Sequence, residues 1–256
     1  MDIQRAAKKI TRAKHLVIST GAGVSAESGV PTFRDALDGL WAKYDPQMLA
    51  TPQAFRANPK LVWDWYWYRR ELVEKTRPNP GHYAIAALEK LLPEVTLITQ
   101  NVDHHHQQAG NKNIITLHGS LFAYKCANNC QGEPTSVEVS RLTWKPEDAP
   151  PTCPYCGKGK VRPDVVWFGE ALPEANLRRA FELARTCDVM LLVGTSNVVY
   201  PAARLPIEAL YQGAFVIEIN SNPTDLTPRM SVFLQGKSGD ILPQLVEAVR
   251  EELGAE

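Results

Sequence analysis

The chain has no net charge, no long apolar run and no apolar leader. Lys plus Arg and Asp plus Glu both number 28, so the charge balance gives no electrostatic reason to expect a nucleic-acid partner. No run of about 18 apolar residues is present, which argues against a membrane span. Residues 1–16 lack the apolar segment and small-residue cleavage site of a secretory signal. We therefore expect a cytoplasmic protein that has neither a nucleic-acid nor a membrane partner.

Cysteine is also scarce, and the few cysteines fall into a pattern. Five are present, which in such a chain favours metal ligands or free thiols over a disulfide framework. Two close pairs, Cys126-x3-Cys130 and Cys153-x2-Cys156, are separated by 22 residues. Two such pairs supply the four thiolates of a tetrahedral zinc site, and four protein ligands make the zinc structural. We expect one zinc per chain; the alternative is four unrelated thiols, and Cys187 is left over.

Short apolar runs alternate with helical patterns along most of the chain. With 256 residues, 44% of them hydrophobic, the chain can bury one large core and a smaller satellite. Strands are expected at 14–20, 95–100, 165–168, 189–194 and 215–219, and helices at 81–92, 173–186, 206–212 and 243–253. This alternation predicts an α/β fold with a Rossmann-like, doubly wound parallel sheet. Residues 1–35, 80–122 and 161–256 would form that domain, and a helical insertion (36–79) and a zinc module (123–160) would form a small lobe.

The first expected strand runs into a glycine-rich turn, Gly21-Ala22-Gly23. Glycines at this place let the backbone approach a pyrophosphate, and a following helix start offers free N–H groups. The spacing departs from G-x-G-x-x-G because Ala26 takes the third glycine's position, so a tight turn without a ligand is the alternative. Phe33 and Arg34, just beyond, are either a lid over a nucleotide or part of a surface loop.

Polar residues follow two further expected strands. Gln100, Asn101 and Asp103 lie at the end of 95–100, where they form either a ribose or amide site or a capped helix start. His118 ends a short strand and is either a general base or a hydrogen-bonded structural residue. The run 104–106 contains three histidines, but adjacent residues of a helix point in different directions, so we expect no single metal site there.

Together these motifs resemble the sirtuin family over about residues 10 to 250. The resemblance is carried by the motifs at 21–25, 28–34, 99–103, 117–120, 165–170, 194–196 and 220–221, together with the four cysteines. One departure is His104, at a position where relatives often have glycine.

The resemblance implies an NAD-dependent enzyme that removes acyl groups from lysine and produces nicotinamide and O-acyl-ADP-ribose. NAD and an acylated-lysine protein or peptide would meet between the two lobes. His118 would be the general base, and Asn101 would take part in catalysis. The implied cofactor-binding residues are Gly21, Ala22, Gly23, Phe33, Arg34, Gln100, Asn101, Asp103, Gly194, Thr195, Ser196, Asn220, Ser221 and Ser238. Val166, Trp167 and Phe168 would flank the acyl-lysine, with backbone pairing to the substrate strand.

A helix is expected after Asn58-Pro59, an N-cap followed by proline at the first turn. On one face it carries Val62, Tyr66, Arg69 and Val73. An arginine on a mainly apolar face needs an anion, because an unpaired buried charge is costly. Pairing with a local carboxylate such as Glu71, or snorkelling to water, is the alternative.

Tyr66-x-x-Arg69 resembles the pair with which one sirtuin class binds the distal carboxylate of succinyl- and malonyl-lysine. Ala50 is a small residue that would leave room for the longer acyl chain. The prediction is a monomeric desuccinylase and demalonylase that also deacetylates, and a preference for acetyl groups is the alternative. From other classes, a non-catalytic NAD or ADP-ribose sensor is disfavoured by the joint presence of Asn101, Asp103 and His118. A zinc-ribbon interaction or nucleic-acid module is disfavoured by the zero net charge and the Rossmann-like remainder of the chain. Protein mono-ADP-ribosylation is an alternative that the sequence leaves open.

Overall fold

The computed structural model describes residues 1–32 and 44–254. The predicted lid residues Phe33 and Arg34 lie outside the described residues. The main feature is a six-stranded, wholly parallel sheet with the strand order β3-β2-β1-β6-β7-β8. Its strands are β1 (Leu16–Thr20), β2 (Val95–Thr99), β3 (Ile114–Thr116), β6 (Val189–Val193), β7 (Phe215–Asn220) and β8 (Val232–Gln235).

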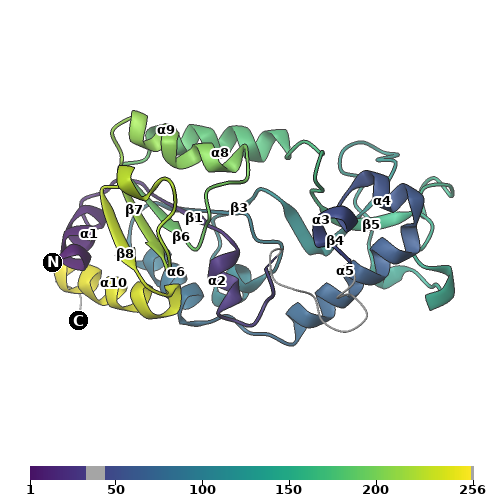
Figure 1. Ribbon diagram of the computed structural model, residues 1–256, viewed down its shortest axis with the longest axis horizontal. Coiled ribbons are helices and arrows are strands. Elements are labelled where there is room, and N and C mark those ends of the chain that lie inside the picture. The colour runs from purple at the N-terminus through teal and green to yellow at the C-terminus, as the bar shows by residue number, and fades with distance from the viewer. Residues whose placement is uncertain (33–43, 255–256) are drawn as a thin grey trace.

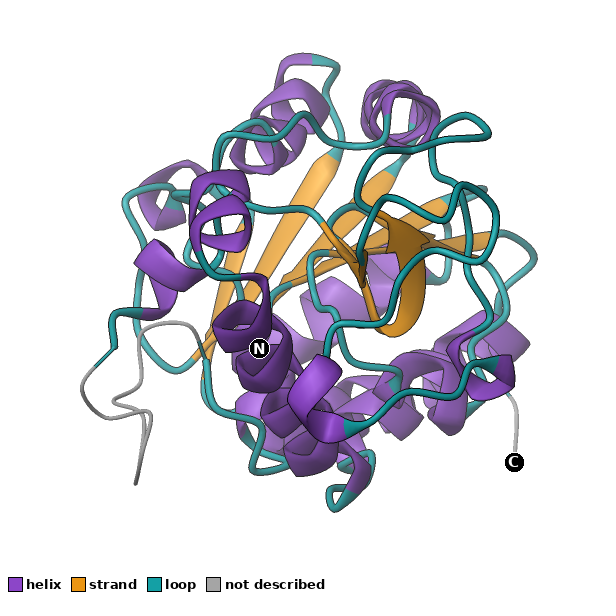
Figure 2. Ribbon diagram, turned by 90° about the vertical axis from the view of Figure 1, so that its right-hand side faces the viewer, coloured by secondary structure: helices purple, strands orange, loops and turns teal. Residues whose placement is uncertain are grey.

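Helices cover both faces of this sheet (Figures 1 and 2). One face packs against α1 (Asp2–Ile10), α6 (Pro80–Leu91) and α10 (Ser238–Leu253), and the other against α8 (Glu174–Thr186) and α9 (Leu205–Tyr211). All residues of β1, β2 and β6 are buried, as expected for strands covered on both sides. The predicted Rossmann-like α/β architecture is therefore confirmed.

The end of the molecule far from the termini has a different construction (Figure 1). There β4 (Gly119–Cys126) and β5 (Val161–Val165) form an antiparallel pair beside α3 (Pro46–Leu49), α4 (Pro52–Ala57) and α5 (Pro59–Glu74). Asn58 caps α5 as predicted, because its Oδ1 accepts a hydrogen bond of 3.1 Å from Leu61 N. The short helices are α2 (Ala22–Ala26), α7 (His105–Ala109), η2 (Val139–Arg141), η3 (Pro146–Asp148), η4 (Ala202–Arg204) and η5 (Thr227–Arg229).

The strand predicted at 165–168 is wrong. The strand there is β5, which ends at Val165 and pairs antiparallel with β4 instead of joining the parallel sheet. The apolar residues that suggested a strand continue into a turn, in which Glu170 N donates to Trp167 O. Helix α10 also begins at Ser238 instead of at Pro243, because this proline is accommodated inside the helix.

The predicted boundary at residue 122 falls inside β4, and the division into two domains stays a prediction. Across residues 1–32 and 44–254, no helix combines the length and apolar character that crossing a membrane requires.

Candidate active site

Two backbone loops meet where the strand order reverses. Strands β1 and β6 are neighbours, but the chain leaves them toward opposite edges of the sheet, which makes their carboxyl ends the topological switch point. Gly23 N donates to Gly194 O over 2.8 Å. A Cβ on Gly23 would lie 2.8 Å from Gly194 Cα, and Gly194 itself has a φ of +59°. The two glycine loops are thus packed backbone against backbone, with no space for a side chain at either glycine.

Polar side chains surround these loops. Asn220 Nδ2, at the end of β7, donates to Thr195 O over 2.9 Å. Gln100 Nε2 lies 3.4 Å from Thr195 Oγ1, which links the ends of β2 and β6. Ser196 and Ser221 are exposed on the same loops. The structure therefore brings the residues predicted for the two halves of the cofactor to one edge of the sheet.

Ser238 is in a different situation. It is buried, and both its backbone N–H (2.7 Å) and its hydroxyl donate to Glu27 Oε1. Gly239 N donates to Glu27 Oε2 over 3.0 Å. Glu27 thus joins the end of α2 to the start of α10, where a carboxylate is favoured by the free N–H groups. The Ser238 hydroxyl already has this internal acceptor, and the sequence did not reveal Glu27.

Asn101 and Asp103 follow β2 and are both buried. Asn101 Nδ2 donates to Ser25 Oγ over 3.0 Å, and His82 Nε2 lies 3.5 Å from the same oxygen. Asp103 Oδ1 accepts from His105 N over 3.0 Å at the start of α7. Asp103 thus supports the start of α7, although the N-cap residue is His104 and not Asn101 or Asp103. The ribose or amide site stays a prediction, and Asn101 is placed against the glycine loop through Ser25. Ser25 and His82 are members of this cluster that the sequence did not indicate.

His118 lies between β3 and β4. Its Nδ1 is 3.0 Å from Gln100 O. A carbonyl oxygen only accepts, so Nδ1 carries the proton and Nε2 keeps its lone pair. Burial lowers the pKa of His118 below its usual 6.5, against an opposing effect of the Gln100 hydrogen bond. The imidazole is therefore neutral at pH 7 and suited to accept a proton.

The three consecutive histidines point to different partners. His104 packs its ring against Phe122 at 3.8 Å between centroids. His105 Nε2 lies 2.8 Å from Thr76 Oγ1 and His106 Nε2 lies 3.1 Å from Thr20 Oγ1. The rings of His105 and His106 nevertheless both approach that of His82, at 5.4 and 4.8 Å. The rings of His82, His105 and His106 thus form a buried histidine cluster, which reaches the site through Ser25 and His82.

The predicted substrate segment lies beside His118. Val166 N donates to His118 O, Trp167 N to Glu170 Oε2 and Phe168 N to Ala50 O, each over 2.9 Å. Trp167 is buried and Phe168 is 46% exposed. Because these three N–H groups are used internally, a substrate strand would pair with the carbonyl groups of this segment.

Tyr66 and Arg69 extend from one face of α5 toward the same region. Tyr66 is 1% exposed, and its buried hydroxyl interacts with the side chain of Trp167, whose indole N–H can donate to it. Burial raises the pKa of Tyr66 to about 12, against an opposing effect of Arg69. Arg69 Cζ lies 6.0 Å from the Tyr66 ring centroid.

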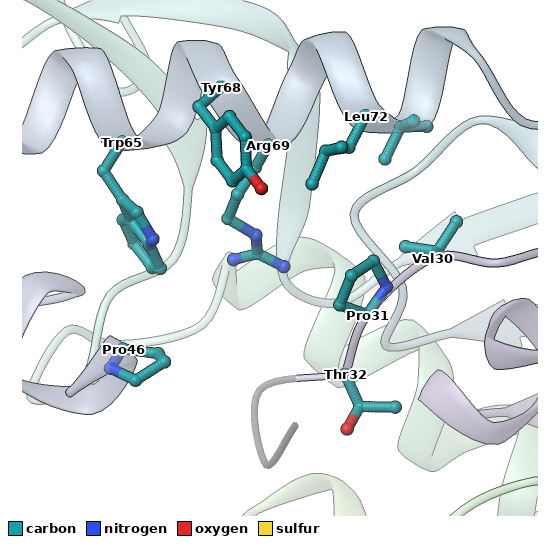
Figure 3. Close-up of a pocket in the computed structure, with 9 residues that line it drawn as sticks. Val30, Pro31, Thr32, Pro46, Trp65, Tyr68, Arg69 and Leu72 are labelled. Atoms are coloured by element: carbon teal, nitrogen blue, oxygen red, sulfur yellow. The ribbon is translucent and has the colours of Figure 1, made fainter. Parts of the chain in front are cut away.

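Arg69 projects into a small cavity of about 20 Å³ between α5 and the segment that precedes residue 33 (Figure 3). Burial lowers its pKa, against the opposing charges of Tyr66 and Asp103. Glu71, the local partner considered from the sequence, accepts a hydrogen bond from Trp67 Nε1 over 3.1 Å. The arginine is thus set in a largely apolar cavity, lined also by Val30, Pro31, Thr32, Pro46, Trp65, Tyr68, Leu72 and Val73.

The four predicted metal ligands form one cluster. The sulfur atoms of Cys126, Cys130, Cys153 and Cys156 all lie within 4.8 Å of one another, and the Cys126–Cys156 and Cys130–Cys153 pairs are 3.9 and 3.8 Å apart. Tetrahedral zinc with Zn–S bonds of about 2.3 Å places its sulfurs about 3.8 Å apart. Backbone N–H groups of Asn128 and Gly159 point at two of the sulfurs, at 3.4 and 3.3 Å. The geometry therefore fits a closed, structural zinc site.

Known proteins resemble this chain over nearly its whole length. The sequence profile of the Sir2 family matches residues 21–201. An NAD-dependent protein deacylase of Pyrococcus furiosus is 49% identical over 95% of this chain and 96% of its own length. NAD-dependent protein deacylase 1 of Pseudomonas aeruginosa is 53% identical over 91% and 94%.

Solved structures agree with these relatives. A Sir2 homologue in complex with NAD superposes with a TM-score of 0.88 at 46% identity, covering 98% of this chain and 94% of that one. A Sir2 protein bound to an acetylated peptide superposes with a TM-score of 0.83 at 28% identity, covering 100% of both chains. The chain therefore belongs to the Sir2 family, as the sirtuin motifs predicted.

Proposed function

We propose that this chain is an NAD-dependent protein-lysine deacylase, which transfers the acyl group of a modified lysine to ADP-ribose. The observation that carries the proposal is the meeting of the two glycine loops with a neutral, oriented His118 and a buried Asn101 at one edge of the sheet. Relatives named NAD-dependent protein deacylase and Sir2 structures with NAD or an acetylated peptide support it.

The residues present fit NAD. The loops at 21–23 and 194–196, with Asn220, would hold its pyrophosphate and adenosine half, and Gln100, Asn101 and Asp103 would surround the nicotinamide riboside. When bound, NAD supplies an electrophilic ribose carbon from which nicotinamide can depart. Nε2 of His118 would be the atom that accepts a proton from a ribose hydroxyl, because Nδ1–H is held by the Gln100 carbonyl. The zinc site takes no part in this chemistry, since four thiolates leave no open coordination position.

We further propose that the enzyme prefers succinyl- and malonyl-lysine to acetyl-lysine. A buried donor without an acceptor costs about 1–3 kcal/mol, and the Tyr66 hydroxyl has no acceptor within the described residues, since the Trp167 N–H can only donate to it. The guanidinium of Arg69 lies on the same side of α5 in an apolar cavity. A carboxylate at the end of an acyl chain would accept hydrogen bonds from the hydroxyl and from the planar fork of the guanidinium. Ala50 is buried in the same apolar cluster as Tyr66, and its small side chain would leave room for the longer acyl group.

The test compares matched acetyl- and succinyl-lysine peptides with NAD, following nicotinamide and O-acyl-ADP-ribose by mass spectrometry. Wild type is measured beside Arg69→Met and Tyr66→Phe. Arg70→Met is the matched control, because it removes the neighbouring guanidinium. That guanidinium donates to Tyr124 and Glu74, and Arg70 does not line the cavity. We expect succinyl turnover to be faster and to collapse in the first two variants while acetyl turnover survives.

Two results would contradict parts of the proposal. If acetyl turnover is faster and Arg69→Met changes neither rate, Arg69 is structural and the enzyme is a deacetylase. If NAD binds but no nicotinamide is released with either peptide, the chain is an NAD sensor and the deacylase proposal fails.

We propose in addition that the protein acts as a cytoplasmic monomer, which size-exclusion chromatography and fractionation would test.

A further inference from the structure

A buried arginine outside the motifs considered so far is tightly held beside the acyl site. Arg162, on β5, is 5% exposed. Its Nη1 donates to Glu170 Oε1 over 2.6 Å and its Nη2 to Glu170 Oε2 over 3.0 Å, and Nη2 also donates to Val165 O over 2.7 Å. The guanidinium thus meets the carboxylate with both arms of its fork, which fixes its plane as well as its position.

The same guanidinium covers the indole ring of Trp167. Arg162 Cζ lies 3.1 Å from that ring's centroid, the shortest of the cation–ring contacts found within the described residues. Glu170 holds Trp167 a second time, because Oε2 accepts from the Trp167 backbone N–H over 2.9 Å. The ion pair therefore constrains both the backbone and the ring of one tryptophan.

Trp167 in turn packs against the acyl-site tyrosine. The rings of Trp167 and Tyr66 are stacked, with centroids 6.2 Å apart and an interplanar angle of 27°. Arg69 then lies over the Tyr66 ring. These contacts connect four side chains from β5, the following turn and α5, in the order Arg162, Trp167, Tyr66, Arg69. Phe55 also packs against Trp167, and Arg69 also lies over Trp65.

We propose that Arg162 is a positioning residue for acyl recognition: with Glu170 it fixes the plane of Trp167, which sets the place of the Tyr66 hydroxyl and thereby favours acyl groups that end in a carboxylate. The inference rests on the proposed role of Tyr66 and Arg69. A buried ion pair is a weak source of stability, since apolar residues of similar volume often replace it without loss. An apolar pair could fill the same volume, but it could not fix the plane of Trp167 as the Arg162–Glu170 pair does. Lysine could not fix this plane either, because it has neither the planar fork nor the stacking face.

Acetyl-lysine has no distal carboxylate, so its turnover does not depend on where the Tyr66 hydroxyl lies. The inference therefore predicts a change in the ratio of two activities and not a general loss. A merely structural Arg162 would lower the melting temperature, or both activities together.

The test uses Arg162→Lys and the double variant Arg162→Met, Glu170→Gln, which leaves no unpaired charge. Asp164→Asn is the matched control, because Asp164 lies on the same strand as Arg162 and its carboxylate pairs with Lys125 over 3.0 Å instead of with the guanidinium. The kcat and KM values for succinyl- and acetyl-lysine peptides are measured well below the melting temperature of each variant. We expect kcat/KM for the succinyl peptide to fall about tenfold or more, mainly through KM, because small misplacements of a binding group are costly. The acetyl values should fall much less, so that the succinyl-to-acetyl ratio of kcat/KM decreases, and both values of Asp164→Asn should stay within about twofold of wild type.

Equal losses for both peptides, or an unchanged ratio, would overturn the positioning role. Arg69→Met, measured in parallel, separates this failure from that of the proposed function. If Arg69→Met loses succinyl turnover selectively while the Arg162 variants keep the wild-type ratio, the carboxylate site stands and Arg162 is structural. If Arg69→Met also keeps the ratio, the proposed acyl preference fails and the positioning role fails with it.

Discussion

Two buried histidines should make the folded protein sensitive to mild acid. His82 is 0% and His106 is 2% exposed, and their ring centroids are 4.8 Å apart. Burial lowers the pKa of both from 6.5 to about 3. Neighbouring histidines contribute to this lowered pKa, His106 and His105 acting on His82 and His105 on His106, while Asp103 acts in the opposite direction on His82. Both rings are therefore neutral in the folded state at any physiological pH.

The size of the effect follows from the difference between the folded and unfolded pKa values. Above pH 6.5 both states are neutral at these residues and stability is unaffected. Below it the unfolded chain binds protons that the folded chain excludes, so stability is lost as the pH falls from 6.5 toward 3. Each histidine then costs about 1.4 kcal/mol per pH unit, or about 2 kcal/mol at pH 5. At pH 5 the two histidines together therefore lower the free energy of unfolding by at most about 4 kcal/mol. This is a large part of a typical stability of about 5–15 kcal/mol.

The assay is the free energy of unfolding from urea titrations between pH 5 and pH 8. The double variant His82→Gln, His106→Asn should show a much flatter pH dependence than wild type, although it is less stable at pH 8 because His82 Nδ1 accepts from Asn79 N. His15→Asn, which changes a histidine outside the cluster, is the control and should keep the wild-type slope. An equal slope in wild type and double variant would refute the reasoning.

Two further predictions concern the base and the metal. His118→Ala should lower turnover by about 10²–10⁴-fold without lowering the melting temperature, and wild-type kcat/KM should lose activity on the acid side with a midpoint below 6.5, since burial lowers the pKa of His118. A normal rate in the variant would remove His118 as the base. Cys153→Ser should reduce both zinc content by mass spectrometry and the melting temperature, because metal binding is coupled to folding. Unchanged values of both would contradict a structural zinc site.

The main sheet could be predicted from sequence because its strands are short, continuous apolar runs. Strands β1, β2, β6 and β7 were found at nearly their observed limits. The small sheet could not be, since β5 contains Arg162, Pro163 and Asp164, which interrupt any apolar pattern. Its existence depends on pairing with β4, which lies tens of residues earlier. Long-range pairing of this kind leaves no local signal.

The site shows the same division between local and distant information. Residues such as Asn101, His118 and Gly194 follow apolar strands, and the end of a parallel strand is where ligands are expected. Glu27, Ser25 and His82 gave no such signal, because their partners lie 50 or more residues away in the chain. His82 looked like an ordinary residue in the first turn of a helix. Only the folded packing of α6 against α2 and α7 shows that its ring lies behind the site.

The small sheet also explains how a zinc site without an open coordination position can serve catalysis. Cys126, a zinc ligand, pairs with Val161 at one end of the β4–β5 ladder, and Gly119 pairs with Val165 at the other. His118 immediately precedes the first of these strands and Trp167 closely follows the second. A zinc ion held by the four cysteines would therefore fix one end of a two-stranded ladder whose opposite end lies next to His118 and the turn that contains Trp167. For this reason Cys153→Ser should lower stability and turnover together, whereas His118→Ala should lower turnover alone.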